Sequence, residues 1–399
     1  MTAIKTRGEV FTPQSIIDEM LDTLPIDVWK SPNLKWLDPC VGHGQFPISI
    51  LERLMMGLKQ IIPEKEERKK HILENMIYMV ELHKPSIDIV NEKLEGSKYN
   101  LNIYEGSFID YKKHLKKVEL PFIFDIIVGN PPYQHHEEGH KRTFPIWDLF
   151  IKRSSKIIRE DGYLLYIHPS GWRDIDGYKR HIFDYIKEHN LIYLSMNSYS
   201  KGAKVFKVST NYDFYLLQHK KTNTNITRVN DIDDILYDID LNKWEFIPNG
   251  MFKEIEKLLS TDDRVCCINK DKCFISRYET VKKYQDEVFK YPCVYTISIK
   301  DGITLYYSSI YRHHTNIPKV IWSNGSGLPF IDYEGKYMIT DFGYAIADEK
   351  ENLPKILEAL LNKDFKKIMS YLIFKKNTKY NCRIIALFKK DFYKHFIST

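Results

Sequence analysis

The sequence predicts an α/β protein in which a mostly parallel sheet, covered by helices on both faces, precedes a second, mixed α/β domain. Three observations predict it: apolar runs alternate with helix-length periodic segments, the composition changes near residue 220, and the later pattern is irregular. Strands that alternate with helices of this length are typical of βαβ units. We therefore predict a sheet domain over residues 1–220, a linker over 221–242 and a second domain over 243–399.

The elements follow from the hydrophobic pattern along the chain. Apolar runs predict strands at 34–37, 77–80, 101–104, 122–128, 163–167, 191–194 and 214–217. Periodic segments predict helices at 14–24, 46–58, 85–94, 144–158 and 178–189. The stretch 220–242 is rich in Asn and Asp and has no period, which favours a linker. Beyond it we expect strands at 294–299 and 319–322 and a helix at 352–361.

Composition limits the class of protein. With 43% hydrophobic residues, the 399-residue chain can bury sizeable cores and is not of the disordered class. It has no apolar stretch of roughly 18 residues and no signal-peptide core at the N-terminus, so we expect no membrane partner and a cytoplasmic protein. The six cysteines form no C-x-x-C pair, which argues against a zinc finger or a disulfide framework.

Charge is concentrated in the second half of the chain. Residues 1–200 hold 27 basic and 28 acidic residues, and residues 201–399 hold 32 and 25, so the excess lies in the latter. Residues 361–399 alone hold ten Lys and Arg against two Asp, interleaved with aromatic residues. Such a segment suits a surface that binds phosphates and stacks on bases, although a solvated lysine face over an aromatic core is an equal alternative.

Two glycines mark a turn after the first predicted strand. The segment Asp38-Pro39-Cys40-Val41-Gly42-His43-Gly44 leads from that strand into a helix. Glycines at this point let the backbone approach a ligand, and an acidic residue at the strand end can accept from an amine. Glu81 ends the next strand, where a carboxylate can receive both hydroxyls of a ribose. The pair indicates a nucleoside ligand.

The tetrapeptide Asn130-Pro131-Pro132-Tyr133 follows the buried strand at 122–128. Its prolines fix the backbone and remove two donors. The carboxamide oxygen of Asn130 and the carbonyl of Pro131 could then accept hydrogen bonds from one NH₂ group, with Tyr133 as a stacking face.

Together with Phe11-Thr12-Pro13 upstream, these motifs resemble the S-adenosylmethionine-dependent DNA adenine-N6 methyltransferases of restriction-modification type. The order of the motifs is similar to the gamma class of that family. The resemblance covers residues 7–219 and implies a doubly wound, Rossmann-like methyltransferase sheet, with the C-terminal mixed α/β domain as the target-recognition domain. It also implies duplex DNA as partner and a flipped adenine as substrate.

The resemblance carries over residue by residue. The implied catalytic residues are Asn130, Pro131, Pro132, Tyr133 and Phe206. The implied S-adenosylmethionine-binding residues are Phe11, Thr12, Pro13, Asp38, Pro39, Gly42, Gly44, Glu81, Ser107, Phe108 and Asn130. Ser107 departs from the acidic residue that the family often has there, which leaves the contact to the cofactor amine open. Phe206, the candidate second aromatic against the target base, is equally well explained as a strand residue in the core.

Other activities were weighed against this one. A cytosine-C5 enzyme needs a nucleophilic Cys, but Cys40 lies in the cofactor turn and Cys293 lies beyond the sheet. Cytosine-N4 enzymes usually begin the tetrapeptide with Ser. A protein-glutamine methyltransferase shares the tetrapeptide but lacks a long basic C-terminal part. An RNA or protein-glutamine N-methyltransferase is the first alternative, and a catalytically inactive nucleic-acid-binding module is the second.

The run His135-His136-Glu137-Glu138-Gly139-His140 is predicted to be a loop that contacts DNA near the extruded base, not a metal site. The reaction needs no metal. We expect any cognate endonuclease to be a separate polypeptide, because the two domains account for the chain. The oligomeric state is left open.

Overall fold

The computed structural model describes residues 11–110, 117–121, 123–136, 143–175, 179–207, 210–224, 226–268, 279–312, 314–374 and 380–397. The chain divides into two units, each with its own contacts. The first unit comprises residues 1–173 and 177–246, and the second comprises 247–399 with the short segment 174–176.

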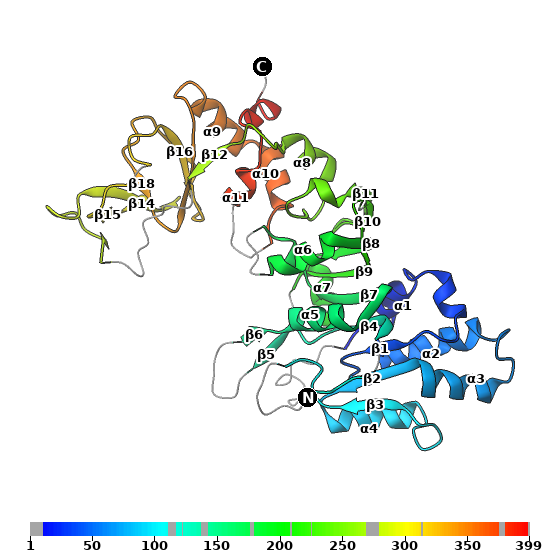
Figure 1. Cartoon of the computed structure of the whole chain (residues 1–399). Coiled ribbons are helices and arrows are strands. Elements are labelled where there is room, and N and C mark those ends of the chain that lie inside the picture. Colours follow the sequence, from blue (N-terminus) through cyan, green and yellow to red (C-terminus); the bar gives the residue numbers. More distant parts are fainter. Residues whose placement is uncertain are drawn as a thin grey trace. The chain divides into compact units, whose positions relative to one another are not determined.

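Nine strands form the sheet of the first unit, in the order β11-β10-β8-β9-β7-β4-β1-β2-β3 (Figure 1). Strands β3, β2, β1, β4 and β7 pair in parallel, whereas β9 runs antiparallel between β7 and β8. The predicted mostly parallel sheet is therefore confirmed. The strands are β1 Trp36–Asp38, β2 Ile77–Glu81, β3 Asn102–Glu105, β4 Phe124–Gly129, β7 Ile158–Pro169, β8 His189–Asn197, β9 Tyr212–Lys221, β10 Ile226–Asn230 and β11 Leu236–Asp240.

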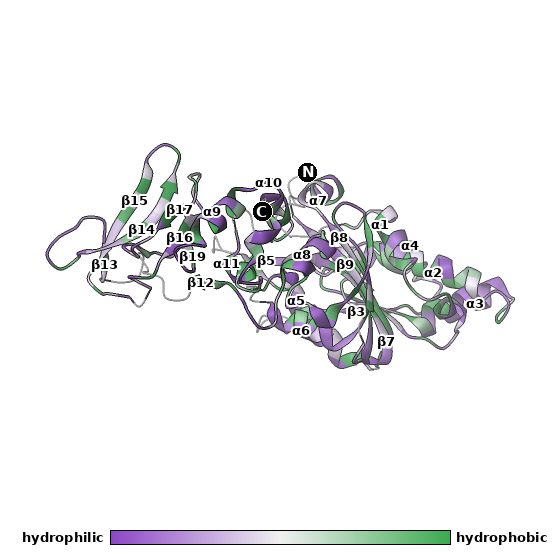
Figure 2. Ribbon diagram, turned by 90° about the horizontal axis from the view of Figure 1, so that it is seen from above, coloured by the Kyte–Doolittle hydropathy of each residue, from purple (hydrophilic) through white to green (hydrophobic). Residues whose placement is uncertain are grey.

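Helices cover both faces of this sheet. Alternate residues of a strand point to opposite faces, so Leu165 of β7 packs with the first helices while Tyr166 bonds Ser154 on the other face. Figure 2 shows apolar residues along the strands and a hydrophilic α3 at the outside. The helices are α1 Gln14–Leu21, α2 Gln45–Gly57, α3 Lys65–His71, α4 Lys84–Lys93, α5 Trp147–Ile157, α6 Arg180–Glu188 and α7 Tyr199–Phe206.

The structure differs from the predicted linker at residues 221–242. This stretch holds the antiparallel hairpin β10–β11, and β10 extends the sheet by pairing with β8. Only one face of β10 is buried, through Thr227 and Val229, and Thr227 Oγ1 donates to Leu191 O over 2.8 Å. Asp231 accepts from two backbone N–H groups in the turn. The Asn and Asp content thus reflects a tight turn and an exposed edge, and the boundary between units falls after Phe246.

The second unit is built from two small sheets and four helices within its described residues. Its sheets have the orders β12-β19-β16-β17 and β13-β15-β14-β18. The buried Lys319 side chain pairs with Asp332 over 3.0 Å within the first of them. The elements are α8 Phe252–Leu258, β12 Cys266–Ile268, β13 Val281–Lys282, β14 Tyr291–Ser298, β15 Gly302–Ser308, β16 Lys319–Ser323, β17 Phe330–Asp332, β18 Met338–Ile339, β19 Gly343–Ala347, α9 Leu353–Leu361, α10 Lys363–Ser370 and α11 Cys382–Ile385.

The expected strands at 294–299 and 319–322 and the helix at 352–361 are confirmed as β14, β16 and α9. Within the parts of the chain that the structure describes, no helix has the length and apolar character to cross a bilayer.

A buried ion pair fixes the start of β9 in the first unit. Arg173 Nε donates to Asp213 Oδ2 over 2.7 Å, Arg173 Nη2 donates to Oδ1 over 3.1 Å, and Trp172 Nε1 donates to Oδ2 over 2.9 Å. Neither charged side chain is exposed to solvent. Removal of one partner would leave an uncompensated buried charge.

We expect Arg173→Met to lower the free energy of unfolding by about 3–5 kcal/mol, measured by urea denaturation. The double variant Arg173→Met/Asp213→Leu should recover part of that loss, because it buries no lone charge. Arg228→Met serves as the matched control, since it removes the exposed pair between Arg228 and Asp238 and should change stability little. A loss of similar size in both single variants would contradict the expectation.

Candidate functional site

Three polar side chains meet at one edge of the nine-stranded sheet. Asp38 ends β1, Glu81 lies at the end of β2, and Asn130 follows directly after β4. β1 pairs in parallel with both β2 and β4, so the carboxyl ends of all three strands lie at the same edge. The structure therefore brings together three of the residues that the sequence singles out.

The turn after β1 requires glycine at two positions. The φ angles of Gly42 and Gly44 are +52° and +83°, in the left-handed region that strains other residues. The Gly42 N–H donates to Glu81 Oε2 over 2.8 Å, and the N–H groups of Leu82 and His83 donate to Oε1 over 2.9 Å. Burial raises the pKa of Glu81, and these hydrogen bonds oppose the rise. Glu81 thus ties the glycine turn to the end of β2.

The Asp38 carboxylate is buried beside the end of β4. Only 3% of the residue is exposed, and Oδ1 accepts from the Cys40 N–H over 3.0 Å. Burial raises the pKa of Asp38 from 3.8 to about 7, and the charge of Glu81 adds to the rise. A Cβ atom at Gly129 would lie 3.1 Å from Asp38 Oδ1, so glycine permits this close approach. A buried carboxylate of this kind suits a positively charged ligand group.

The segment before α1 lies against both the glycine turn and Asn130. Asn130 Nδ2 donates to Thr12 Oγ1 over 3.0 Å, although the two residues are 118 positions apart. The rings of Phe11 and His43 lie with their centroids 4.4 Å apart. Pro13 then precedes the first residue of α1. The predicted grouping of Phe11, Thr12 and Pro13 with the two later motifs is therefore seen in space.

Tyr133 is half-buried, and its hydroxyl is buried. Among the described residues, that hydroxyl has no hydrogen-bond partner. Burial raises the pKa of Tyr133 well above its usual value, and Tyr212 and Asp213 contribute to the rise. The phenol is therefore neutral, and its ring can serve as a stacking face. Pro131 is buried and Pro132 is half-buried in the same turn.

A hairpin follows Tyr133. Its second strand takes the place of the first residues of the helix that the sequence predicts at 144–158. β5 (Gln134–His136) pairs with β6 (Thr143–Pro145), and the Ile146 N–H donates to Tyr133 O over 3.2 Å. Pro145 disfavours helical backbone at Phe144, so α5 begins only at Trp147. Of the predicted DNA-contacting loop 135–140, His135 and His136 belong to β5, and residues 137–140 lie outside the described residues. Within the residues that are described, no three His, Cys, Asp or Glu side chains are grouped to hold a metal.

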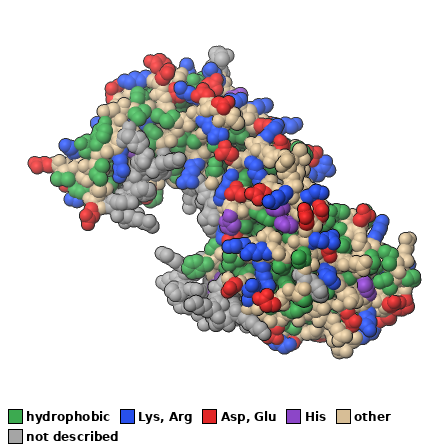
Figure 3. Space-filling view, viewed as in Figure 1, with side chains coloured by type: hydrophobic (Ala, Val, Ile, Leu, Met, Phe, Trp, Pro, Cys, Tyr) green, Lys and Arg blue, Asp and Glu red, His purple; other side chains and the backbone are tan. Residues whose placement is uncertain are grey.

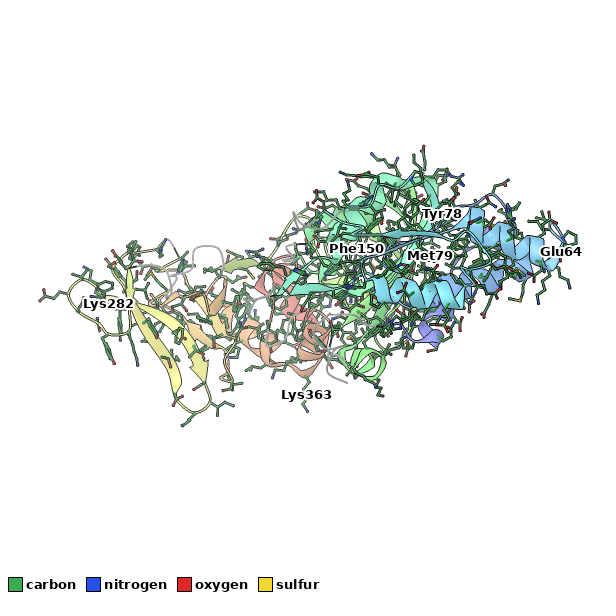
Figure 4. The ribbon with its side chains drawn as sticks, turned by 90° about the horizontal axis from the view of Figure 1, so that it is seen from below. Glu64, Tyr78, Met79, Phe150, Lys282 and Lys363 are labelled. Carbon is green, nitrogen blue, oxygen red and sulfur yellow. The ribbon has the colours of Figure 1, made fainter. Side chains whose placement is uncertain are left out.

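The side chains of Ser107 and Phe108 are directed into the protein. Ser107 Oγ donates to Ile109 O over 2.7 Å, and only 2% of Phe108 is exposed. The Phe108 ring stacks on Phe150, which lies among the layers of the unit in Figure 4, with centroids 5.4 Å apart. The Arg153 guanidinium lies 4.6 Å from the Phe108 ring centroid and donates to its carbonyl. The carbonyl groups of both residues are also used within the protein, because the Ser107 carbonyl accepts from the Val118 N–H over 3.0 Å.

Phe206 ends helix α7 and is not a strand residue. It is 7% exposed, and its ring packs edge-on against Tyr212 with centroids 4.9 Å apart. Both residues belong to the core that also holds α1 and α2. Tyr212, which acts on the pKa of Tyr133, is a neighbouring aromatic residue that the sequence analysis missed. Its only sequence signal is an aromatic residue at the start of a strand, which is common.

Comparison with known proteins shows which family and which proteins the chain resembles. Residues 49–206 match the family described as Eco57I restriction-modification methylase. A protein of Mycoplasma pneumoniae named an uncharacterized adenine-specific methylase is 29% identical, and the match covers 41% of this chain and 55% of that protein. The type II restriction enzyme and methyltransferase RM.Eco57I of Escherichia coli is 30% identical over 66% of this chain and 32% of its own length.

The type II methyltransferase M.BstVI of Geobacillus stearothermophilus is 29% identical, over 40% of this chain and 33% of that protein. The chain thus spans about half or less of the length of these relatives. The resemblance drawn from the sequence is confirmed: between residues 49 and 206 the chain matches the family of Eco57I restriction-modification methylases.

Proposed function

We propose that the chain is a site-specific DNA adenine-N6 methyltransferase that uses S-adenosylmethionine. The observation that carries the proposal is the position of Asn130, directly after β4, whose last residue, Gly129, lies against the buried Asp38 carboxylate of β1. Relatives named adenine-specific methylase and type II methyltransferase support adenine in DNA as the target. A cognate endonuclease is a proposed partner, because one relative is named as both a restriction enzyme and a methyltransferase.

The residues at the strand edge fit the proposed cofactor. Asp38 can accept from its ammonium group, Glu81 can accept from its ribose hydroxyls, and Gly42 leaves the backbone open to it. Phe11 and Pro39 border the same turn. The side chains and carbonyl groups of Ser107 and Phe108 are engaged within the protein, so we do not include them in the proposed site. When bound, S-adenosylmethionine supplies an electrophilic methyl group on a positively charged sulfonium.

The protein's own contribution at the adenine is to orient the amine. The N6 lone pair is delocalised into the ring, which makes the nitrogen a poor nucleophile. Asn130 Oδ1 and the carbonyl of Pro131 accept hydrogen bonds from the two N–H groups of this amine. These bonds favour a pyramidal, more electron-rich nitrogen. Pro131 and Pro132 carry no N–H group, so the backbone there presents acceptors only. Positioning and electrostatics therefore supply the rate enhancement, with no covalent intermediate on the protein.

The target base must leave the duplex, because its amine cannot be reached inside the helix. Extrusion costs a few kcal/mol, which stacking on the ring of Tyr133 offsets in part. Phe206 supports this face indirectly through Tyr212, since its own ring is buried in the core.

We assign target recognition to the second unit. Its last helices expose Lys and Arg side chains, among them Lys363, which projects from α10 in Figure 4, and Figure 3 shows such side chains across the visible face. Most of the aromatic residues between them do not offer a stacking surface. Tyr371 and Phe396 are half-buried, and the others are buried: Phe374, Tyr380, Phe388, Phe392 and Tyr393. DNA binding by this segment would therefore be electrostatic. The exposed basic residues are Lys363, Lys366, Lys367, Arg383, Lys389, Lys390 and Lys394.

The test of the proposed function is incubation with methyl-labelled S-adenosylmethionine and, in separate reactions, duplex DNA, RNA and a protein extract. Label should enter DNA, and sequencing should report N6-methyladenine at one recurring sequence. Label in RNA or in protein glutamine instead would overturn the assigned substrate and favour one of the alternatives.

The first prediction concerns the tetrapeptide. Asn130→Ala should lower the rate of methyl transfer at least about 100-fold, because it removes an acceptor aimed at the amine, while cofactor binding measured by calorimetry stays within a few-fold. Tyr133→Ala should also cripple transfer, whereas Tyr133→Phe should retain it, since the ring and not the hydroxyl is used. Asn190→Ala, which removes a remote amide contact to Gln218, is the control. Parent-like transfer by Asn130→Ala would refute the site.

The second prediction concerns charge in the second unit. Replacing Arg383, Lys389 and Lys390 together by Glu should weaken DNA binding and reduce the slope of log Kd against log salt by up to about 3. The residues Lys375, Lys376 and Lys379, which the sequence also offers for this role, lie outside the described residues. The matched control is the triple variant Lys59→Glu/Lys65→Glu/Lys70→Glu, which reverses three exposed charges of the first unit. An unchanged slope in the first triple variant would remove this surface from the DNA interface.

The third prediction concerns the protonation of Asp38. Because its pKa is about 7 in the folded protein and near 3.8 when unfolded, the folded state holds a proton that the unfolded chain has released at intermediate pH. Stability therefore falls as pH rises from about 4 to 7 and is flat above. We expect Asp38→Asn to raise the unfolding free energy at pH 8 by on the order of 2–4 kcal/mol, and to change it little near pH 3.

The ionisation of the Asp38 carboxyl should also control the affinity for S-adenosylmethionine. In the parent protein, the affinity for S-adenosylmethionine should rise between pH 6 and 8 as Asp38 ionises, and Asp38→Asn should bind weakly throughout, as measured by calorimetry. Asp110→Asn, at an exposed site, is the control for both measurements. A parent-like pH dependence of stability in Asp38→Asn would show that another group titrates.

A further inference from the structure

We infer that Thr12 is a positioning residue for the Asn130 amide and not a ligand of the cofactor. The inference rests on the proposed function, because it concerns the atom of Asn130 that receives the adenine amine. It separates Thr12 from its neighbour Phe11, although both lie in the segment that the family resemblance assigns to the cofactor.

The hydroxyl of Thr12 is already used by the protein. Only 7% of the residue is exposed, and its Oγ1 accepts from Asn130 Nδ2 over 3.0 Å. A carboxamide has one donor group and one acceptor atom on opposite arms. With Nδ2 directed at Thr12, Oδ1 is directed away from it. While its hydroxyl accepts from Nδ2, Thr12 holds the amide in the orientation that offers an acceptor, and not a donor, to the adenine N6.

The backbone that carries this hydroxyl is well anchored. The carbonyl of Pro13 accepts from the N–H groups of Ile16 and Ile17 over 3.0 and 3.2 Å, which fixes the start of α1. Gln14 Nε2 donates to Ser49 Oγ over 2.8 Å, which ties α1 to α2. A short side chain on a fixed backbone holds its partner more tightly than a long, mobile one would. The fixed backbone thus allows Thr12 to restrict rotation of the Asn130 carboxamide.

The neighbouring side chain lies at the glycine turn instead. Phe11 contacts the ring of His43, and a Cβ atom at Gly42 would lie 3.9 Å from the Phe11 ring. Within two consecutive residues, one side chain borders the cofactor turn and the other the catalytic amide. This division predicts different kinetic consequences for changes at the two positions.

The experiment compares Thr12→Val, which keeps the shape but removes the hydroxyl, with Thr12→Ser, which keeps the hydroxyl. Thr12→Val should lower kcat for DNA methylation about 10- to 100-fold, as expected when a reacting group loses its alignment. Its Kd for S-adenosylmethionine should stay within about twofold of the parent value, and 2-aminopurine at the target position should report unchanged base extrusion. Thr12→Ser should restore most of kcat.

Thr23→Val is the matched control. It removes a threonine hydroxyl just after the other end of α1, where Thr23 Oγ1 donates to Met20 O over 2.6 Å, and it should leave kcat at the parent value. If Thr12→Val lowers the melting temperature markedly more than Thr23→Val does, Thr12→Ala tests the same lost hydrogen bond without a branched apolar side chain.

The outcomes are distinguishable. A Thr12→Val variant with weakened cofactor binding and parent-like kcat would make Thr12 a cofactor ligand and overturn the inference. So would a variant that equals the parent in both quantities. A parent protein that methylates RNA or protein instead of DNA would refute the proposed substrate, but the split between kcat and cofactor Kd would still decide the role of Thr12.

Discussion

The close approach of β4 to the end of β1 is the constraint on which the site depends. Gly129 has no side chain, and a Cβ atom there would come within 3.1 Å of the Asp38 carboxylate. Asn130, the next residue, lies within hydrogen-bond distance of Thr12. Any larger residue at position 129 would have to move Asp38, and with it the glycine turn that leads into α2.

The cost of this arrangement is a carboxylate whose burial opposes its ionisation near neutral pH. Other buried acids of the unit have basic partners, since Asp213 pairs with Arg173 and Asp148 pairs with Lys179. A cationic ligand would give Asp38 a partner that the protein does not supply. Destabilised charges of this kind are common where binding, not folding, determines the residue.

The sequence predicts the sheet well because its strands are buried on both faces and read as apolar runs, as at Phe124–Gly129. It fails at β10–β11, where a single buried face and an Asp-rich turn look like a linker, and at Phe144, where a hairpin replaces the start of a helix. The motif residues Asp38, Glu81 and Asn130 could be predicted to converge. The buried positions of Ser107 and Phe108 could not, because burial depends on partners such as Arg153 that are distant in sequence. For Phe206 the sequence left a core position and a place against the target base equally open.

The hydrogen bond between Thr12 and Asn130 has a consequence for folding. It joins residues 118 positions apart, and the strands β1, β2, β3 and β4 lie between them in the chain. Contacts of such long sequence separation form only after the intervening elements have assembled, because loop closure is otherwise uncompensated. The amide of Asn130 is therefore oriented late, once α1 has docked on α2. A partly folded chain could hold a complete glycine turn and still lack an aligned acceptor, so cofactor binding and catalytic competence need not appear together during folding.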